Sequence, residues 1–195
     1  MPDGRLVAGV FLASLAYAIV RYNVFGTVDW QQVPVFVTNK AISVASLVML
    51  GVSRVVVDKA RRKRLGLVGA ALAGLHVLLS FMVLDRSYIA KLYQPSGAMT
   101  GATEWSMLAA AIATTLLGWL LYATALRPLD TQSQGTSLVR GLARIVLVLT
   151  ALHVAFIGWP VWITPATWPG KLPPITLLSC ALALVFCLMP RARSR

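Results

Sequence analysis

Six apolar stretches, separated by short polar segments, occupy most of the chain of 195 residues. A membrane-spanning helix needs about 20 mainly apolar residues, and stretches of this kind with few charges are typical of such helices. The segments between them are too short to hold a separate soluble domain. The pattern therefore predicts an all-α integral membrane bundle, one transmembrane domain over residues 1–195, with spans at about 6–20, 35–57, 65–84, 105–126, 138–159 and 175–189.

The first apolar stretch has a second interpretation. Arg5 precedes it, and Ala16-Tyr17-Ala18 has the small-x-small form of a signal-peptide cleavage site. Because Ile19 and Val20 continue the stretch and more spans follow, we favour an uncleaved first helix.

Composition agrees with the pattern. Hydrophobic residues make up 58% of the chain and charged residues 12%, and the mean hydropathy is +0.76. These values exclude a soluble enzyme, a nucleic-acid-binding domain and a disordered tail. The formal net charge of +12 would suggest a polyanionic partner in a soluble protein, but here the basic residues cluster between the spans, as topology signals do.

The basic residues predict the orientation. Alternating sides span by span puts thirteen Lys and Arg on one side, including the dense run at residues 58–64, and five on the other. The positive-inside rule then places both termini in the cytoplasm, whether or not the first stretch is cleaved. We expect an integral protein of a bacterial inner membrane, in contact with its lipids, and the sequence does not predict an oligomeric state.

Two outer loops carry aromatic residues. Tyr88, Ile89, Leu92 and Tyr93 have the spacing of one helical face and predict a short interfacial helix. The last outer loop, residues 159–174, is rich in Pro and Trp and is typical of an aromatic belt at the membrane boundary.

The chain has two histidines, His76 and His153, and both fall within predicted spans. An ionisable side chain is costly there and is by default a candidate functional residue. His76 lies nine residues before Asp85, and His153 lies seven before Pro160. Both would sit about 10 to 14 Å below the outer surface at 1.5 Å per residue. Two imidazoles at one depth on different helices can take both axial positions of a haem iron.

Small residues surround the first histidine on its helical face. Gly69, Ala73 and Ser80 would leave a shallow groove for a flat macrocycle. Close packing of helices through small residues is the alternative, and we favour it for the glycines taken by themselves. No Asp or Glu lies deep in a span, which weakens a proton-pump or cation-transporter interpretation.

The stretch Arg61-Arg62-Lys63-Arg64-Leu65-Gly66-Leu67, followed by Gly74-Leu75-His76, resembles the third helix of the ferric reductase-like transmembrane domain family. Asn39-Lys40-Ala41 and Leu152-His153 also fit its pattern. This family includes the haem subunit of the bacterial methionine sulfoxide reductase system and is related to NADPH oxidases and STEAP reductases. The resemblance covers about residues 35–160. It implies a six-helix bundle that binds b-type haem between the third and fifth helices, with His76 and His153 as metal ligands, and that moves electrons across the membrane.

The chain departs from that family in its inner half. Many members carry a further histidine pair there, whereas this sequence has Arg140 and Arg62-Lys63, and a guanidinium does not replace imidazole as an iron ligand. We therefore expect one haem b, near the outer face. Lys40 is a candidate cofactor-binding residue as a counter-charge for a haem propionate or an anionic substrate, and the alternative is a lysine that snorkels to the headgroups.

The sequence thus predicts a haem b membrane electron-transfer protein, the membrane component of an oxidoreductase. No dinucleotide-binding motif is present, so we expect a separate flavoprotein or a quinol as the electron donor, with flavin or quinone supplied from outside the chain. The basic run, with Arg140 and Arg144, is a candidate docking surface for an acidic donor. The alternative, from another class, is a haem-free small transporter or membrane assembly factor in which the histidines are structural.

Overall fold

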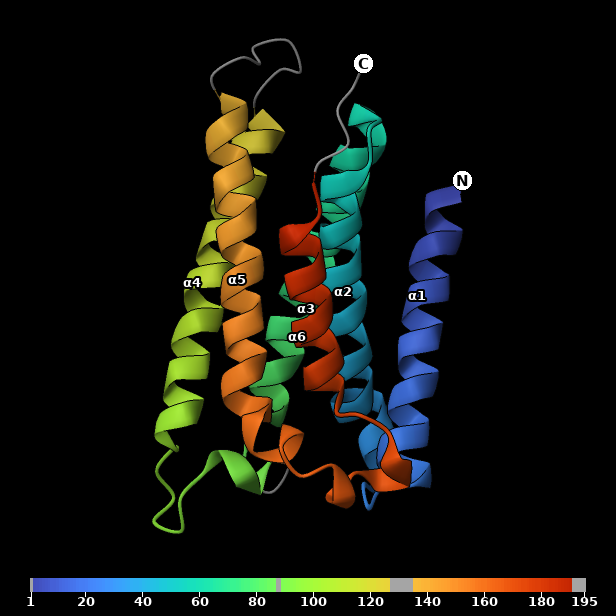
Figure 1. The fold of residues 1–195 in the computed structure, drawn as a ribbon, viewed down its shortest axis with the longest axis vertical. Coiled ribbons are helices and arrows are strands. Elements are labelled where there is room, and N and C mark those ends of the chain that lie inside the picture. The colour runs from blue at the N-terminus through green and yellow to red at the C-terminus, as the bar shows by residue number, and fades with distance from the viewer. Residues whose placement is uncertain (1, 87–88, 127–134, 191–195) are drawn as a thin grey trace.

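The computed structural model describes residues 2–86, 89–126 and 135–190, and the fold within them is built from helices. Six helical segments are long and apolar enough to cross a membrane. The predicted all-α membrane bundle is thereby confirmed. The six long helices (Figure 1) are α1 (Pro2–Ile19), α2 (Thr38–Val55), α3 (Lys59–Val83), α4 (Gly101–Leu126), α5 (Gly135–Trp162) and α6 (Ile175–Leu188).

The connection between α1 and α2 is more helical than the sequence pattern indicates. A π-helical turn, η1 (Val20–Val24), continues α1, and the turns η2 (Trp30–Gln32) and η3 (Val33–Val37) lead directly into α2. Pro34 is tolerated at the start of η3 because a first turn leaves its N–H groups without helical partners. The first two apolar segments therefore reach from Asp3 to Val24 and from Trp30 to Val55.

The basic run also proves to be helical. Lys and Arg favour helix, and Asp58 caps the run because its carboxylate accepts a hydrogen bond from the backbone N–H of Arg61 at 2.5 Å. Asp3 of α1 forms ion pairs with Arg61 at 2.7 Å and with Arg64 at 3.1 Å. The run therefore forms the first turns of α3, and an acidic residue distant in sequence neutralises part of its charge.

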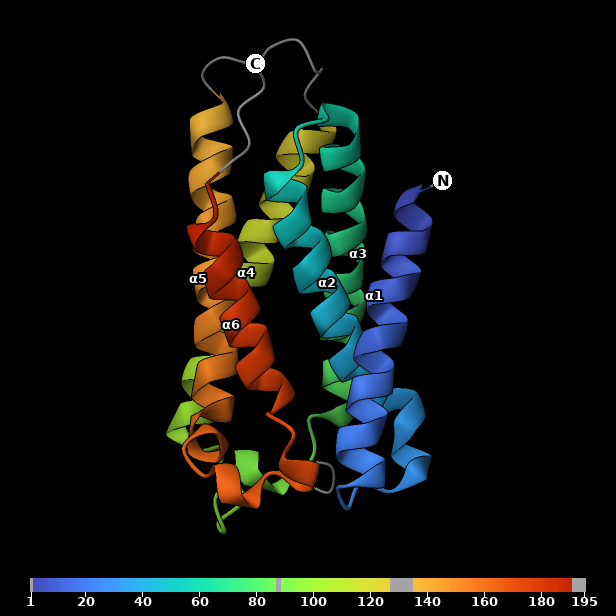
Figure 2. The ribbon, with the colours of Figure 1, turned by 45° about the vertical axis from the view of Figure 1, so that its right-hand side comes forward.

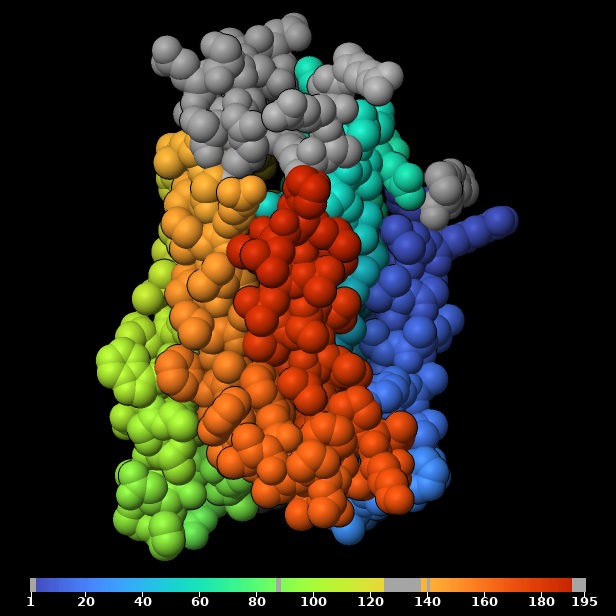
Figure 3. All heavy atoms as spheres, viewed as in Figure 1, coloured from blue at the N-terminus to red at the C-terminus, as the bar shows by residue number. Residues whose placement is uncertain are grey.

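The helices pack in two groups that α6 connects. In one group α2 packs on α1 and α3, and in the other α5 packs on α4. Helix α6 lies against both α5 and α2, as Figures 1 and 2 show. In Figure 3 the side chains of α6 cover the face between these two helices. A cluster of buried side chains holds this junction together: Leu47, Leu147, Ala151, Ala183 and Phe186.

Two features of this packing matter for the site. In the described part of the chain, α3 and α5 do not form a closely packed pair, and α3 meets the second group mainly through α4. The start of α1, the end of α6 and the α2–α3 turn all lie at one end of the bundle (Figure 1). We call the opposite end the outer end, following the orientation that the basic residues predict.

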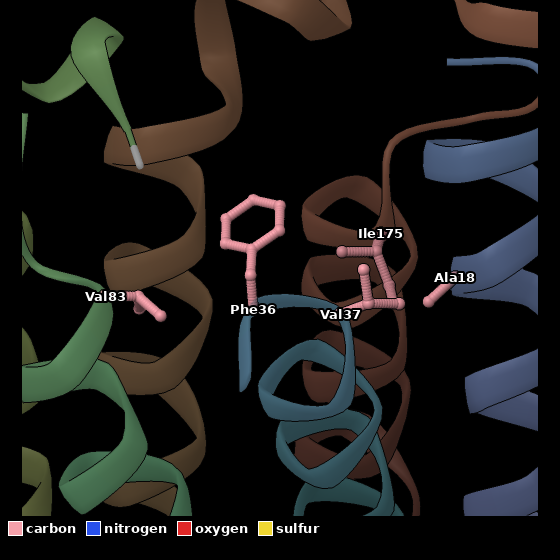
Figure 4. Close-up of a cluster of buried hydrophobic side chains, with 5 residues drawn as sticks. All are labelled: Ala18, Phe36, Val37, Val83 and Ile175. Atoms are coloured by element: carbon pink, nitrogen blue, oxygen red, sulfur yellow. The ribbon is translucent and has the colours of Figure 1, made fainter. Parts of the chain in front are cut away.

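A second core closes the outer end. Figure 4 shows Ala18 of α1, Phe36 and Val37 of η3, Val83 of α3 and Ile175 of α6. All five are buried. The ends of α1, α3 and α6 therefore meet here, and the turn that precedes α2 is fixed between them.

The predicted interfacial helix is wrong within the described residues. Residues 87–88 lie outside them, and beyond these only a 3-10 turn, η4 (Ala90–Leu92), forms. Leu92 is buried, and the Tyr93 hydroxyl donates to the carbonyl oxygen of Leu84 at 3.2 Å. The segment turns back onto the bundle because these protein contacts replace those that an amphipathic helix would make with lipid.

The tryptophans of the last outer loop have two kinds of surroundings. Trp159 is exposed, as expected of an aromatic belt. Trp162 instead donates its indole N–H to the Thr176 hydroxyl at 3.0 Å, and Trp168 donates to the carbonyl oxygen of Val161 at 2.7 Å. The first bond joins the end of α5 to the start of α6, and the second holds the loop against α5.

Two glycines of α3 provide a matched test of the α2–α3 packing. A Cβ at Gly69 would lie 2.9 Å from the backbone nitrogen of Leu50, whereas a Cβ at Gly74 would have no neighbour within 4 Å. We expect Gly69→Ala to lower the unfolding temperature, because the backbones of α2 and α3 would have to move apart to make room for the added Cβ. Gly74→Ala should leave it unchanged or raise it slightly, since alanine favours helix by about 1 kcal/mol over glycine. Thermal unfolding of both variants in detergent measures this, and equal unfolding temperatures would contradict the packing.

Candidate metal centre

His76 of α3 is held by a short chain of hydrogen bonds to α2. Its Nδ1 lies 2.7 Å from Oδ1 of Asn39. The Asn39 amide Nδ2 donates to the Ser80 hydroxyl at 3.1 Å, and that hydroxyl donates to the carbonyl oxygen of His76 at 2.7 Å. Asn39 is buried, so the orientation of the imidazole is set from within the protein.

His153 of α5 is held by α4 in a similar way. Its Nδ1 lies 2.8 Å from Oγ of Ser106 and 3.0 Å from the carbonyl oxygen of Ser106. The Ser106 hydroxyl also lies 2.9 Å from the carbonyl oxygen of His153 and donates to it. Ser106 is fully buried. Each histidine is therefore fixed by a polar residue on the neighbouring helix of its own group.

These partners determine which nitrogen of each ring carries the proton. Oδ1 of Asn39 and the Ser106 carbonyl oxygen can only accept hydrogen bonds, so each faces a protonated Nδ1. Each neutral imidazole then has its lone pair on Nε2. Among the described residues, neither Nε2 has a hydrogen-bond partner. Both rings are thus in the form that metal-binding histidines adopt when a second residue holds Nδ1.

The two imidazoles are close enough to interact electrostatically. They come from α3 and α5, which do not pack closely on each other in the described part of the chain. Both lie in the outer halves of their helices, His76 seven residues before the end of α3 and His153 nine before the end of α5. The described residues contain no group of three or more His, Cys, Asp or Glu side chains that could hold a metal ion.

Gly69 and Ala73, the small residues that precede His76 on α3, differ in their surroundings. Gly69 lies against Leu50 of α2, and its carbonyl oxygen accepts a hydrogen bond from the Ser46 hydroxyl at 2.8 Å. Its absent side chain serves helix packing, which is the alternative that the sequence left open. Ala73, one turn before His76, is half-buried. A role for Gly69 or Ala73 in binding a macrocycle stays a prediction.

Lys40 follows Asn39 directly and lies at the outer end of α2. Its Nζ is 4.3 Å from the ring centre of Phe36 and 5.1 Å from that of Tyr22. Its positive charge is close enough to act on His76. The side chain therefore packs against two aromatic rings of the protein.

The residues that hold His153 could not be identified from the sequence. Ser106 is a hydroxyl near the start of an otherwise apolar span, and that isolated polarity was the available signal. Asn39 had a weaker signal, as an amide at the opening of α2. Arg140 lies in α5, as expected, and Cys180 and Cys187 are free thiols.

No family model and no curated protein matches the chain.

Proposed function

We propose that this chain is a haem b-binding membrane electron-transfer protein, a ferric reductase-like component that passes electrons from a cytoplasmic or quinol donor to an acceptor at the outer face. The observation that carries the proposal is the pair of matching imidazoles. His76 and His153 each have Nδ1 held by a neighbouring helix and Nε2 without a partner. Two helices that do not pack closely present them.

The residues fit a bis-imidazole haem. Haem iron takes neutral imidazole nitrogens as ligands, and His76 and His153, when neutral, would offer Nε2 to it. Asn39 and Ser106 would keep both rings in that tautomer and fix their planes. When bound, haem supplies an iron that takes up and releases single electrons.

One haem per chain follows from the histidine count. The sequence contains no third histidine, and the position on α5 where a second ligand would be expected is Arg140. A donor must therefore reach the outer half of the bundle from the cytoplasmic side without a second protein-ligated haem.

A separate donor is part of the proposal. The basic first turn of α3 faces the side that we assign to the cytoplasm, and it would attract an acidic flavoprotein. Asp3 forms ion pairs with Arg61 and Arg64. The net positive charge of this turn is therefore smaller than the sequence suggests. A quinol reaching the bundle through the bilayer is the other source of electrons.

A reduction experiment tests the need for a donor. We expect haem-loaded protein mixed anaerobically with NADPH to keep its oxidised Soret band, because the chain offers no nucleotide-binding motif. Adding a flavin reductase should shift the band, more slowly at high salt if the basic turn docks the donor. Rapid reduction by NADPH without a partner would contradict the proposal.

A second candidate is a haem-free bundle in which the histidines brace the helices. The bonds from His76 to α2 and from His153 to α4 favour it, because each crosses between two helices. The two functions differ at Nε2. A bracing histidine uses Nδ1 only, so its removal should destabilise the apoprotein, whereas a ligand's removal should eliminate haem binding from a protein that still folds.

A further inference from the structure

A buried arginine at the outer end has donors without acceptors. Only 3% of Arg21 is exposed, and its Nε and Nη1 have no hydrogen-bond partner among the described residues. The guanidinium carbon lies 5.2 Å from the ring centre of Tyr22. A contact with an aromatic face attracts the charge but does not satisfy its N–H donors. The structure thus leaves a buried cation with hydrogen bonds still to make.

Two lysines lie close to Arg21. Nζ of Lys40 lies 5.1 Å from the ring centre of Tyr22, the ring that the Arg21 guanidinium also contacts. The same Nζ packs over Phe36, whose place in the outer core is shown in Figure 4. Lys91 of η4 interacts electrostatically with both Lys40 and Arg21. Three positive charges from separate segments therefore gather at one end of the bundle.

None of these three cations forms a salt bridge within residues 2–86, 89–126 and 135–190, where both ion pairs involve Asp3 near the other end of α1. Burying a cation without a counter-charge is costly, and bringing like charges together adds to that cost. A bound anion would offset both.

We propose that Arg21, Lys40 and Lys91 form an anion-binding site at the outer end of the bundle, and that its ligand is a dicarboxylate. Arginine and lysine donate strong, charge-assisted hydrogen bonds to carboxylates. Three cations can accommodate two carboxylate charges. Arg21 would form the buried floor of the site, and the exposed Lys91 its entrance.

The site adjoins the histidine pair. Asn39 and Lys40 are consecutive on α2, and Asn39 holds His76 while Lys40 belongs to the cationic group. Haem b is itself a dicarboxylate, so its two propionates are one source of the ligand, and this source rests on the proposed function. A soluble dicarboxylate from the outer side is the other source.

Two binding measurements separate these sources. In the first, thermal unfolding of the haem-free protein is followed in detergent with succinate or with chloride at equal ionic strength. In the second, Soret titrations compare haem with haem dimethyl ester, which lacks the carboxylate charges. Both use wild type, Arg21→Gln, Lys91→Gln and the control Lys171→Gln. Lys171 is another exposed basic residue of the outer loops. Lys91→Gln alters an exposed side chain, so it is informative even if Arg21→Gln fails to fold.

We expect at least one preference for carboxylate in wild type, either stabilisation by succinate or haem affinity at least about tenfold above that of the ester. Lys91→Gln and Arg21→Gln should weaken that preference, while Lys171→Gln keeps it. A preference for haem over its ester identifies the porphyrin as the source, and protection by succinate identifies a soluble ligand.

The outcomes also separate this site from the proposed function. Protection by succinate in a protein that binds no porphyrin would contradict the haem proposal and support the anion site. Equal affinity for haem and ester, with no effect of succinate, would overturn the anion site and leave the histidine ligation intact. A carboxylate preference that survives in both Lys91→Gln and Arg21→Gln would also overturn it.

Discussion

Replacing either imidazole, His76→Ala or His153→Ala, is expected to abolish stable haem binding. The chain has no third histidine, so neither variant retains a second imidazole to complete the axial pair. The measurement is the Soret absorbance per polypeptide of protein purified after expression with added haem precursor. Leu75→Ala is the matched control, because Leu75 precedes His76 on α3 and its side chain is exposed.

A folding measurement accompanies the haem content. If the histidines are ligands, the haem-free forms of His153→Ala and wild type should unfold within a few degrees of each other. Full haem occupancy in both alanine variants would contradict the ligand assignment. The bracing function would be favoured by two results together: wild type binds no haem, and the alanine variants unfold at a much lower temperature than wild type.

Replacing the residues that hold Nδ1 is expected to weaken haem binding without eliminating it. Asn39→Leu removes the acceptor at 2.7 Å from His76, and its imidazole is then free to rotate or to change tautomer. Losing such a partner costs about 10- to 100-fold in metal affinity. Haem titration of the purified apoprotein measures the change in affinity.

Ser43→Ala is the control for Asn39→Leu. Ser43 is also a polar residue of α2, but its hydroxyl donates only within its own helix, to the Lys40 carbonyl oxygen at 2.8 Å. We expect it to bind haem as wild type does. If Asn39→Leu also retained wild-type affinity, the hydrogen bond to His76 would have no part in positioning a ligand.

The helices were predictable because each span carries its own signal. An apolar stretch of membrane length specifies a helix locally, whatever its neighbours. The prediction of equal depth for His76 and His153 used the same regularity, through their distance from each span's end, and it stays a prediction. The ends of the helices were less predictable, as the helical turns before α2 and the capped basic run of α3 show.

The contacts between segments could not be predicted from the sequence. Asp3 and Arg61 are far apart in sequence and meet only because α1 lies near the start of α3. Ser106 meets His153 through the packing of α4 on α5. The grouping of Arg21 with Lys91 likewise depends on how η4 folds back. Each requires the tertiary arrangement, which hydropathy and charge patterns do not encode.

The most direct test is the haem content and ligation state of the purified wild-type protein. We predict about one b-type haem per polypeptide by pyridine haemochrome assay, with the low-spin electron paramagnetic resonance spectrum of a bis-imidazole iron. Protein that folds but takes up no haem when haem is supplied, or that holds a high-spin iron with a single imidazole ligand, would contradict the proposed metal centre.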